Sequence, residues 1–264
     1  MNNFKFNTDD IITTDGYLEF CNKNNICYIK TDYFYTGSLI WRGQRHPINV
    51  SDICVAGHSD HPINDNISNN HRLIFCVNRN TNNDNVFGLP LGITNDSGES
   101  QLHSVYGNKQ SMVDVSNESI DKQTLAYLNF NINTYHKERQ YVFDKFKNQP
   151  WTKIGNIVNT IEGRKQFLRD IKASKFVICP RGNGIDTHRL WETLYMGSIP
   201  VVKYEPTHHL FKDLPILFIN DWDEVTEEFL NEKYTEITNK EWNMEKLKLS
   251  YWENFIRTTI SNIQ

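Results

Sequence analysis

The chain has 264 residues, of which 38% are hydrophobic and 12% aromatic, and its formal net charge at pH 7 is −4. This supply of apolar side chains is enough to build packed cores, which excludes disorder over most of the chain, and the length fits one large domain or two of about 130 residues. A weakly acidic chain lacks the cationic excess that a phosphate backbone requires, so a general nucleic-acid-binding protein is also excluded.

The first 20 residues are acidic and contain no apolar run of signal-peptide length. No segment approaches the roughly 18 uninterrupted apolar residues of a membrane-spanning helix. We therefore expect a soluble protein that is not secreted and has no membrane span. The five cysteines are odd in number, lack a CxxC spacing and mostly lie in apolar runs such as DICVA and LIFCV, so we expect buried, reduced thiols.

In the first half of the chain, short apolar or β-branched runs predict strands at 25–30, 52–56, 73–77 and 86–91. Several of these runs are continuously apolar, as expected of parallel strands that are buried on both faces. The Asn-rich stretch 78–85 is predicted to be a loop. From Thr94 to Ser119 the chain turns polar with scattered Gly and Ser, which places a domain boundary near residue 118.

Strands and helices alternate more clearly in the second half. The predicted strands span 125–131, 176–179, 199–202 and 216–219. The predicted helices span 135–147, 164–173, 187–196, 224–230 and 241–260. This alternation predicts a doubly wound α/β architecture with two domains in tandem, 1–118 and 119–264, and it leaves open that the C-terminal helix crosses back to the first domain.

The most informative segment is FVICPRGNGIDTHRLWETLYMGSIPVVK, residues 176–203. A strand runs to Pro180, a turn with Arg181 and two glycines follows, and Asp186 or Thr187 can cap the next helix. In open parallel sheets, ligands bind at the carboxyl ends of strands, where a loop leads into a helix N-terminus that favours phosphate. Glycines let the backbone approach a ligand closely, and an arginine fork can hold two phosphate oxygens. The segment therefore predicts a phosphate-binding turn.

The helix after this turn adds His188, Arg189 and Glu192. Glu192 lies just over one turn inside the helix, so its carboxylate can accept hydrogen bonds from two ribose hydroxyls when phosphates occupy the helix N-terminus. With Arg181, this arrangement predicts a nucleotide clamp. The alternative is a purely structural strand–turn–helix with a surface arginine and a helix salt bridge between Arg189 and Glu192. The density of polar residues between two buried strands favours the clamp.

This segment resembles the C-terminal signature of exostosin-like glycosyltransferases, glycosyltransferase family 47 and its short bacterial and giant-virus relatives. In that signature a strand, a PRG turn, a helix bearing R-x-x-E and a P-V-V strand form the nucleotide-sugar site. Weaker resemblance extends to VAGHSDHPI (55–63), GLPLGITN (88–95), LNFNINTYHKER (128–139) and the pair Tyr251-Trp252. The resemblance implies a GT-B-like fold, two Rossmann-like domains facing a central cleft, with the acceptor on the side of 1–118 and the nucleotide sugar held by 119–264.

Carried over to this sequence, the resemblance implies that Arg181 contacts the donor diphosphate and Glu192 the ribose. The donor-binding residues that we expect are Arg181, Gly182, Asn183, Gly184, Asp186, Thr187, His188, Arg189 and Glu192, with Asn131 and Arg139 from the start of the second domain. For Arg139 the alternative is a solvated helix charge beside Glu138. The resemblance further implies inverting, metal-independent transfer of a hexose or pentose from a UDP-linked donor to a hydroxyl of a glycan or glycosylated acceptor, with no other cofactor. The expected location is the cytoplasm, or the host cytoplasm if the chain is viral.

An inverting transfer needs a general base that deprotonates the acceptor hydroxyl. His58 and Asp60 follow a predicted strand, so they lie at its carboxyl end and would face the clamp across the cleft. Either residue can act as the base, with a pKa tuned by burial and neighbours. The alternatives are a helix-capping turn or a structural His–Asp pair. A metal bound by His58 and His61 is disfavoured, because no further ligand cluster accompanies them.

Asp221-Trp222-Asp223 follows an apolar strand, and a D-x-D motif at such a place holds a divalent metal in GT-A glycosyltransferases. Because little chain remains after it for an acceptor half, helix capping by Asp221 or Asp223 is favoured. His208 and His209 are expected in a loop from which either can approach the sugar. Two rival functions remain: a GT-A-like, metal-dependent transferase, and a non-catalytic relative that binds nucleotide or glycan.

Overall fold

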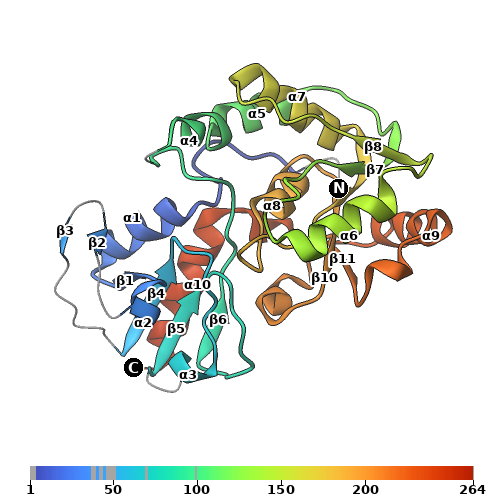
Figure 1. Cartoon of the computed structure of the whole chain (residues 1–264). Helices are drawn as coiled ribbons and strands as arrows, with labels where there is room; N and C mark the ends of the chain where they lie inside the picture. Colours follow the sequence, from blue (N-terminus) through green and yellow to red (C-terminus); the bar gives the residue numbers. More distant parts are fainter. Residues whose placement is uncertain are drawn as a thin grey trace.

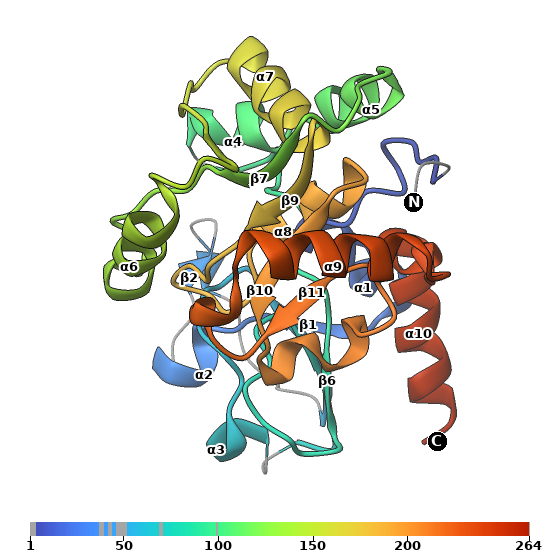
Figure 2. The same ribbon diagram turned by 90° about the vertical axis from the view of Figure 1, so that its right-hand side faces the viewer.

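The computed structural model describes residues 4–36, 40–41, 44–45, 52–68, 71–98 and 100–263. Over these residues the chain forms two parallel β-sheets with helices packed around them (Figures 1 and 2), and a short antiparallel ribbon of β2 (Ile40–Trp41) and β3 (Gln44–Arg45). The expected α/β fold class with two parallel, Rossmann-like sheets is confirmed.

The first sheet has the strand order β1-β4-β5-β6, and every pairing in it is parallel. Its strands are β1 (Cys27–Lys30), β4 (Ile53–Gly57), β5 (Leu73–Cys76) and β6 (Val86–Gly88). All four residues of β5 are buried, as its continuous apolar run predicts. Helix α1 (Thr14–Asn24) packs on this sheet, while α2 (Tyr33–Thr36) and α3 (Asp65–Ser68) are single turns. Asn78 follows β5 with a left-handed backbone, at a φ of 58°.

The second sheet has the strand order β11-β10-β9-β7-β8, again parallel throughout. Its strands are β7 (Thr124–Leu128), β8 (Thr152–Ile154), β9 (Ser174–Ile178), β10 (Ile199–Lys203) and β11 (Leu217–Ile219). The chain builds outward from β7 to β8, then returns to the other side of β7 and continues from β9 to β11. The strand order therefore reverses between β7 and β9, which is where ligands bind in open α/β sheets.

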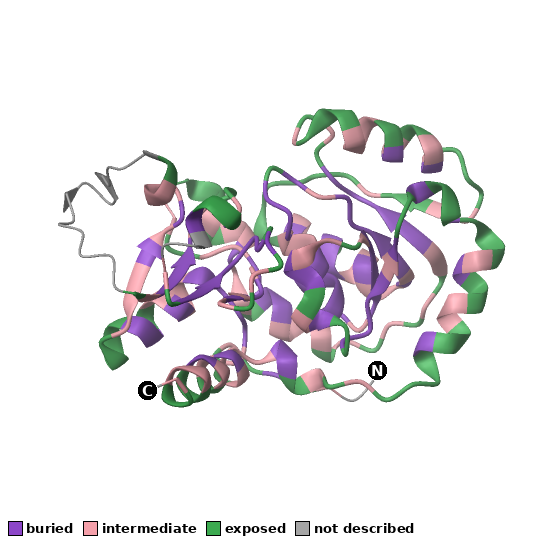
Figure 3. Ribbon diagram, turned by 90° about the horizontal axis from the view of Figure 1, so that it is seen from below, coloured by how far each residue is buried: buried purple, intermediate pink, exposed green. Residues whose placement is uncertain are grey.

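Four helices belong to the second sheet: α6 (His136–Phe146), α7 (Ile161–Lys172), α8 (His188–Tyr195) and α9 (Glu227–Thr238). Short 3₁₀ helices span Pro206–Phe211, Trp222–Glu224 and Met244–Leu247. Every residue of α8 from Leu190 to Tyr195 is buried, so this helix lies inside the molecule (Figure 3). The two residues at the start of the helix, His188 and Arg189, are half-buried.

The polar stretch that we predicted as a connection contains two helices, α4 (Gln101–Tyr106) and α5 (Lys109–Asn117), both of which pack against α7. Met112 and Val115 lie three residues apart on one face of α5 and are fully buried. Two apolar side chains at helical spacing are thus sufficient to dock a helix that is otherwise polar. The position of the domain boundary stays a prediction.

The C-terminal helix α10 (Leu249–Ser261) packs against the first domain (Figure 1). The backbone N–H of Leu249 donates to the carbonyl of Asp10 at 2.8 Å, and the ring of Phe255 packs edge-on against Phe75 and Phe87 of the first sheet. The segment predicted as one helix from 241 to 260 is therefore a 3₁₀ turn followed by α10. One apolar core cluster includes buried residues of both domains, so the domains are packed together.

Cys21, Cys54, Cys76 and Cys179 are buried, Cys27 is half-buried, and all five thiols are free, which confirms the expectation for most of them. Burial raises the pKa of the Cys21 and Cys179 thiols to about 12. In the part of the chain that the structure describes, every helix is too short or too polar to cross a bilayer.

Candidate functional site

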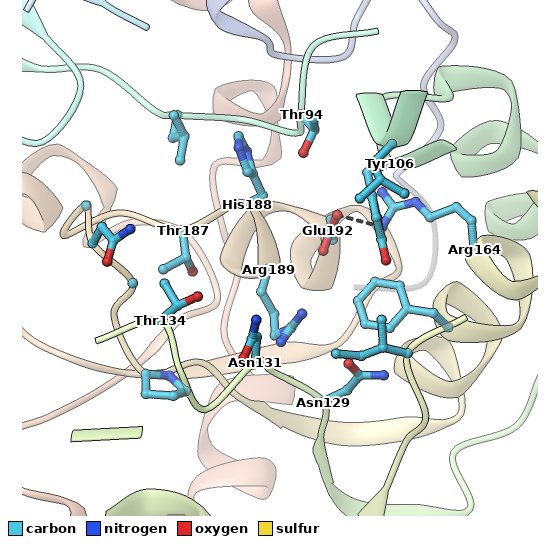
Figure 4. A pocket seen from close by; sticks show the side chains of 18 of the residues that line it. Thr94, Tyr106, Asn129, Asn131, Thr134, Arg164, Thr187, His188, Arg189 and Glu192 are labelled. Carbon is cyan, nitrogen blue, oxygen red and sulfur yellow. Dashed lines mark hydrogen bonds and ion pairs between the residues drawn. The ribbon is translucent and has the colours of Figure 1, made fainter. Parts of the chain in front are cut away.

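A cavity of about 530 Å³, which we call the large cavity, lies at the carboxyl ends of β7 and β9 (Figure 4). The first domain contributes Asp60, Leu91 and Thr94 to its lining, and α4 contributes Leu102 and Tyr106. The remaining lining residues come from the loops after β7, β8 and β9 and from α6, α7 and α8. The cavity therefore lies at the point where the strand order of the second sheet reverses.

The turn between β9 and α8 forms one wall of this cavity. A Cβ on Gly184 would lie 2.9 Å from the Asn78 amide nitrogen and 3.2 Å from Asp60 Oδ1, so the turn approaches the first domain closely only because this residue is glycine. A Cβ on Gly182 would lie 3.2 Å from Arg139 Nη2. The loop after β4 therefore lies next to the glycine-rich turn, as we expected.

Most of the residues predicted to bind a donor line the large cavity. They are Asn131, Arg139, Gly182, Asn183, Gly184, Asp186, Thr187, His188, Arg189 and Glu192. Figure 4 shows Thr134 and Thr187 at one end, Arg189 and Asn131 in the middle, and Glu192 with Tyr106 and Arg164 at the other end. The side chains that the sequence predicted as donor-binding thus form one elongated set along the cavity. Their individual roles stay predictions.

Arg181 lies elsewhere. Its guanidinium donates to the carbonyl of Asn183 at 3.2 Å and to that of Gly182 at 3.4 Å, and it stacks 4.4 Å from the ring centroid of Tyr135. It lines a second, small pocket that shares Thr187 with the large cavity and whose other charged residues are Glu138, Lys203 and Glu205. The structure therefore does not bring Arg181 and Glu192 to one cavity. The physical reason is that the carbonyls of Gly182 and Asn183 hold the Arg181 guanidinium, while Arg139 donates to the carbonyls of Pro180 and Arg181.

Two guanidinium groups, Arg139 and Arg189, give the middle of the cavity its positive charge. Arg139 donates to the carbonyl oxygens of Arg181 at 2.8 Å and Asn131 at 2.9 Å. Burial, together with the positive charge of Arg189, lowers the pKa of Arg139 to about 10. The buried Nε of Arg189 has no hydrogen-bond partner. Among the described residues neither guanidinium forms an ion pair, so the site holds two uncompensated cations.

Glu192 is 4% exposed and pairs with the fully buried Arg164 of α7, with 2.6 Å between Oε1 and Nη1 (Figure 4). The alternative prediction, a salt bridge within the helix between Arg189 and Glu192, is therefore wrong. The Arg164 guanidinium makes one more hydrogen bond, from Nη2 to the Met112 sulfur at 3.4 Å, and its Nε is unpartnered. Sequence reasoning missed Arg164, although its spacing to Phe167, Leu168 and Ile171 places it on the buried face of α7.

Asp186 is 3% exposed, and its carboxylate accepts from the backbone N–H groups of Leu91 (2.9 Å) and Thr187 (2.8 Å) and from Trp191 Nε1 (2.8 Å). Burial raises its pKa to about 6. Leu91 belongs to the first domain, so this carboxylate joins the two domains. Thr187 occupies the N-cap position of α8 without a side-chain capping bond, and Asp186 accepts outside the helix, so the predicted cap is wrong in detail.

His188 opens α8, and its Nδ1 lies 2.8 Å from the carbonyl oxygen of Gly92. Because a carbonyl can only accept, Nδ1 carries the proton and Nε2 is an acceptor in the neutral ring. Burial lowers the pKa of this imidazole, which favours the neutral form. The neutral His188 ring therefore carries its lone pair on Nε2.

A second cavity of about 440 Å³ lies on the side of the first domain. It shares Asp60, Leu91, Thr94 and His188 with the large cavity, so the two meet at these residues. Asp60 is exposed, and its carboxylate makes no hydrogen bond or ion pair to a described residue. Of the two predicted base candidates, Asp60 thus lies at the junction.

His58 does not line the large cavity. Its Nδ1 lies 2.6 Å from the hydroxyl of Tyr28 and its Nε2 2.8 Å from Asp15 Oδ1, so both ring nitrogens have partners. This is the structural His–Asp pair that we considered as an alternative. His61 Nε2 lies 3.7 Å from Asp32. Over the described residues there is no group of three or more His, Cys, Asp or Glu side chains suited to a metal.

Asp221 and Asp223 lie outside both cavities. Asp221 caps the 3₁₀ turn Trp222–Glu224, with its side chain accepting from the N–H of Asp223 at 3.0 Å. The capping was predicted for the helix that follows, but that helix, α9, is capped by Thr226. Asp223 accepts from Tyr141 at 2.5 Å and Lys145 at 2.6 Å. His208 is buried, and its Nδ1 accepts from the backbone N–H of Glu205 at 3.1 Å, while His209 lies in the same 3₁₀ helix outside the large cavity.

Comparison with known proteins shows one family match. Residues 148–263, less than half of the chain, match the family model of the RXYLT1 C-terminal domain, which belongs to the exostosin-like glycosyltransferases. The match includes the turn and α8, and it supports a glycosyltransferase. Among curated proteins no sequence match is found.

Two solved structures of an α1,3-fucosyltransferase, one of them with GDP, are similar to this chain. Their sequence identities are 14% and 13%, the alignments cover 94% of this chain and 87% of each of those chains, and both TM-scores are 0.41.

Proposed function

We propose that this protein transfers a sugar from a nucleotide-sugar donor to a hydroxyl acceptor. The observation that carries the proposal is the pair of uncompensated guanidinium groups, Arg139 and Arg189, in a 530 Å³ cavity beside the first turn of α8. Two neighbouring like charges that form no ion pair with a described residue are costly unless an anion joins them. Planar guanidinium groups near a helix N-terminus suit a diphosphate. Cavities of this size hold ligands of nucleotide size.

The bound diphosphate is the leaving group of this reaction. Negative charge develops on it as the bond to the sugar breaks, and cations already in place stabilise that charge without reorganisation. Glu192 lies on the far side of Arg189 from the turn (Figure 4), and one of its oxygens is held by Arg164. We assign its other oxygen to the ribose hydroxyls. Arg181 takes no part in this arrangement, because it does not line the cavity.

The acceptor enters from the second cavity and meets the donor sugar at Asp60. The hydroxyl oxygen of the acceptor forms a bond to the anomeric carbon of the donor sugar. The bond from that carbon to the diphosphate oxygen breaks, and its electron pair leaves with the diphosphate. The acceptor proton passes to the carboxylate of Asp60. Attack from the side opposite to the leaving group inverts the anomeric centre. His188 Nε2 lies at the same junction and is the competing base.

We further propose that the transfer needs no metal, since the two arginines supply the positive charge that a divalent ion supplies in other transferases. Donor turnover should persist in excess EDTA. A loss that Mn²⁺ restores would favour a metal site instead. Location in the cytoplasm also stays a proposal.

Binding of a nucleoside diphosphate, measured by calorimetry, tests the proposal. Charge-assisted hydrogen bonds contribute about 1.5–3 kcal/mol each, so Arg189→Ala should weaken binding about 10- to 100-fold. The matched control is Arg181→Ala, because this arginine belongs to the same segment but lies outside the cavity. Equal affinities in the two variants, or no binding of UDP, CDP, GDP or ADP by the wild type, would overturn the proposal.

A further inference from the structure

One end of the large cavity is apolar. Leu102 and Tyr106 of α4, Ile157 and Val158 of the loop before α7, and Phe167 of α7 line it together. Leu102 is 40% exposed, Ile157 56% and Val158 50%, so these side chains are only partly covered by the protein. Exposed apolar side chains that gather at one mouth of a cavity mark a binding surface.

This apolar end adjoins the charged groups in a definite order. The guanidinium of Arg164 lies 5.9 Å from the ring centroid of Tyr106 and 5.4 Å from that of Phe167, while the guanidinium of Arg189 lies 5.3 Å from Phe167. Glu192 and Arg164 lie beside Tyr106, and Arg189 comes next along the cavity (Figure 4). An aromatic surface is thus followed by a carboxylate and then by unpaired cations.

We infer that the apolar end is the nucleobase subsite of the donor, with the base lying against the ring of Tyr106. The inference rests on the proposed function, because the cation pair fixes where the phosphates lie. The order base, ribose, phosphate in a nucleotide then matches the order aromatic ring, carboxylate, guanidinium. A flat, weakly polar ring is the occupant that stacks on an aromatic side chain.

Tyr106 is suited to this task because its orientation is fixed. Its hydroxyl donates to Asn159 Oδ1 at 2.5 Å, which ties α4 to the loop that carries Ile157 and Val158. Leu102 and Tyr106 also lie outside residues 148–263, the segment that matches the family model. The subsite therefore depends on a part of the chain that the family match does not cover.

The test compares a nucleoside diphosphate with inorganic pyrophosphate, which shares its charge but has no base. Calorimetry is run with UDP, CDP, GDP, ADP and pyrophosphate on the wild type, and each variant is measured with the tightest diphosphate and with pyrophosphate. Tyr106→Ala should weaken the nucleoside diphosphate about tenfold, the effect of losing one aromatic stack, and leave pyrophosphate unchanged. Tyr106→Phe keeps the ring and loses only the bond to Asn159, so it should bind the nucleoside diphosphate more tightly than Tyr106→Ala does.

Ile157→Ala provides a second variant that leaves Tyr106 intact, and Ile154→Ala is its control. Ile154 is 46% exposed on β8 but does not line the cavity. We expect Ile157→Ala, and not Ile154→Ala, to weaken the nucleoside diphosphate selectively. If Tyr106→Ala and Ile157→Ala change neither ligand, or both ligands equally, the base lies elsewhere. If no diphosphate binds the wild type at all, the proposed function itself fails.

Discussion

The two ends of the large cavity differ in whether their charged side chains form ion pairs. At the Tyr106 end, the guanidinium of Arg164 and the carboxylate of Glu192 are buried and neutralise each other. In the middle and at the turn, Arg139, Arg189 and Asp60 carry charges that no described residue of opposite sign pairs with. A paired buried charge serves the fold, whereas an unpaired charge at a cavity is available to a ligand. Substitution of the paired Arg164 and substitution of an unpaired charged residue should therefore separate stability from activity.

The largest effect is expected at the unpaired carboxylate. Asp60→Asn should lower sugar transfer about 10²- to 10⁴-fold, the usual contribution of a general base, and leave the unfolding free energy and the affinity for nucleoside diphosphate unchanged. Transfer kinetics and calorimetry check this result. His188→Gln is the comparison, since a Gln amide can still donate to the Gly92 carbonyl. If His188→Gln loses transfer and Asp60→Asn does not, the base is His188.

The next largest effect is expected at the paired arginine. Arg164→Met leaves Glu192 buried without a counter-charge, so the unfolding free energy should fall by about 3–5 kcal/mol. The matched control is Arg169→Met, because Arg169 lies on the same helix but forms its ion pairs with Glu118 and Glu162 at the surface. Surface pairs contribute about 1 kcal/mol or less. Urea unfolding measures both, and equal losses would refute the distinction between the two ends.

A smaller and pH-dependent effect is expected at Asp186, whose buried carboxylate has only N–H partners. Its pKa of about 6 lies above the unfolded value of about 3.9, so its contribution to stability is fully present below pH 4 and is lost as the pH rises through 6. Between pH 7 and pH 5 the wild type should gain about 1 kcal/mol relative to Asp186→Asn. Urea unfolding at the two pH values checks this, and a constant difference would contradict it.

The fold was predictable where the sequence pattern is local. The continuous apolar runs of β5, β9 and β10 identified these strands, and alternation with helices identified the fold class. Helix α5 was missed because only Met112 and Val115 give it an apolar face, and β8 was missed because Thr152–Ile154 has no buried residue. Patterns this short carry little information about the element that they form.

The site was predictable as a segment but not as a set of contacts. The glycine-rich turn marks the cavity wall. Nothing in the local sequence indicates that Arg139, 42 residues before Arg181, donates to the backbone carbonyl of Arg181, or that the Arg181 side chain lies outside the cavity. The partner of Glu192 lies 28 residues away on α7. Both contacts depend on how helices pack over the second sheet, which a single sequence does not specify.

The buried side chain of Asn78 connects two parts of the candidate site. Its amide nitrogen donates to the carbonyl of Ser59 at 3.1 Å, and its amide oxygen accepts from the N–H of Asp186 at 2.9 Å. One buried side chain thus sets the spacing between the loop that carries Asp60 and the start of α8. The conformational entropy of bringing a proton acceptor opposite an anion site is lost during folding, so an arriving substrate does not bear that cost at each turnover.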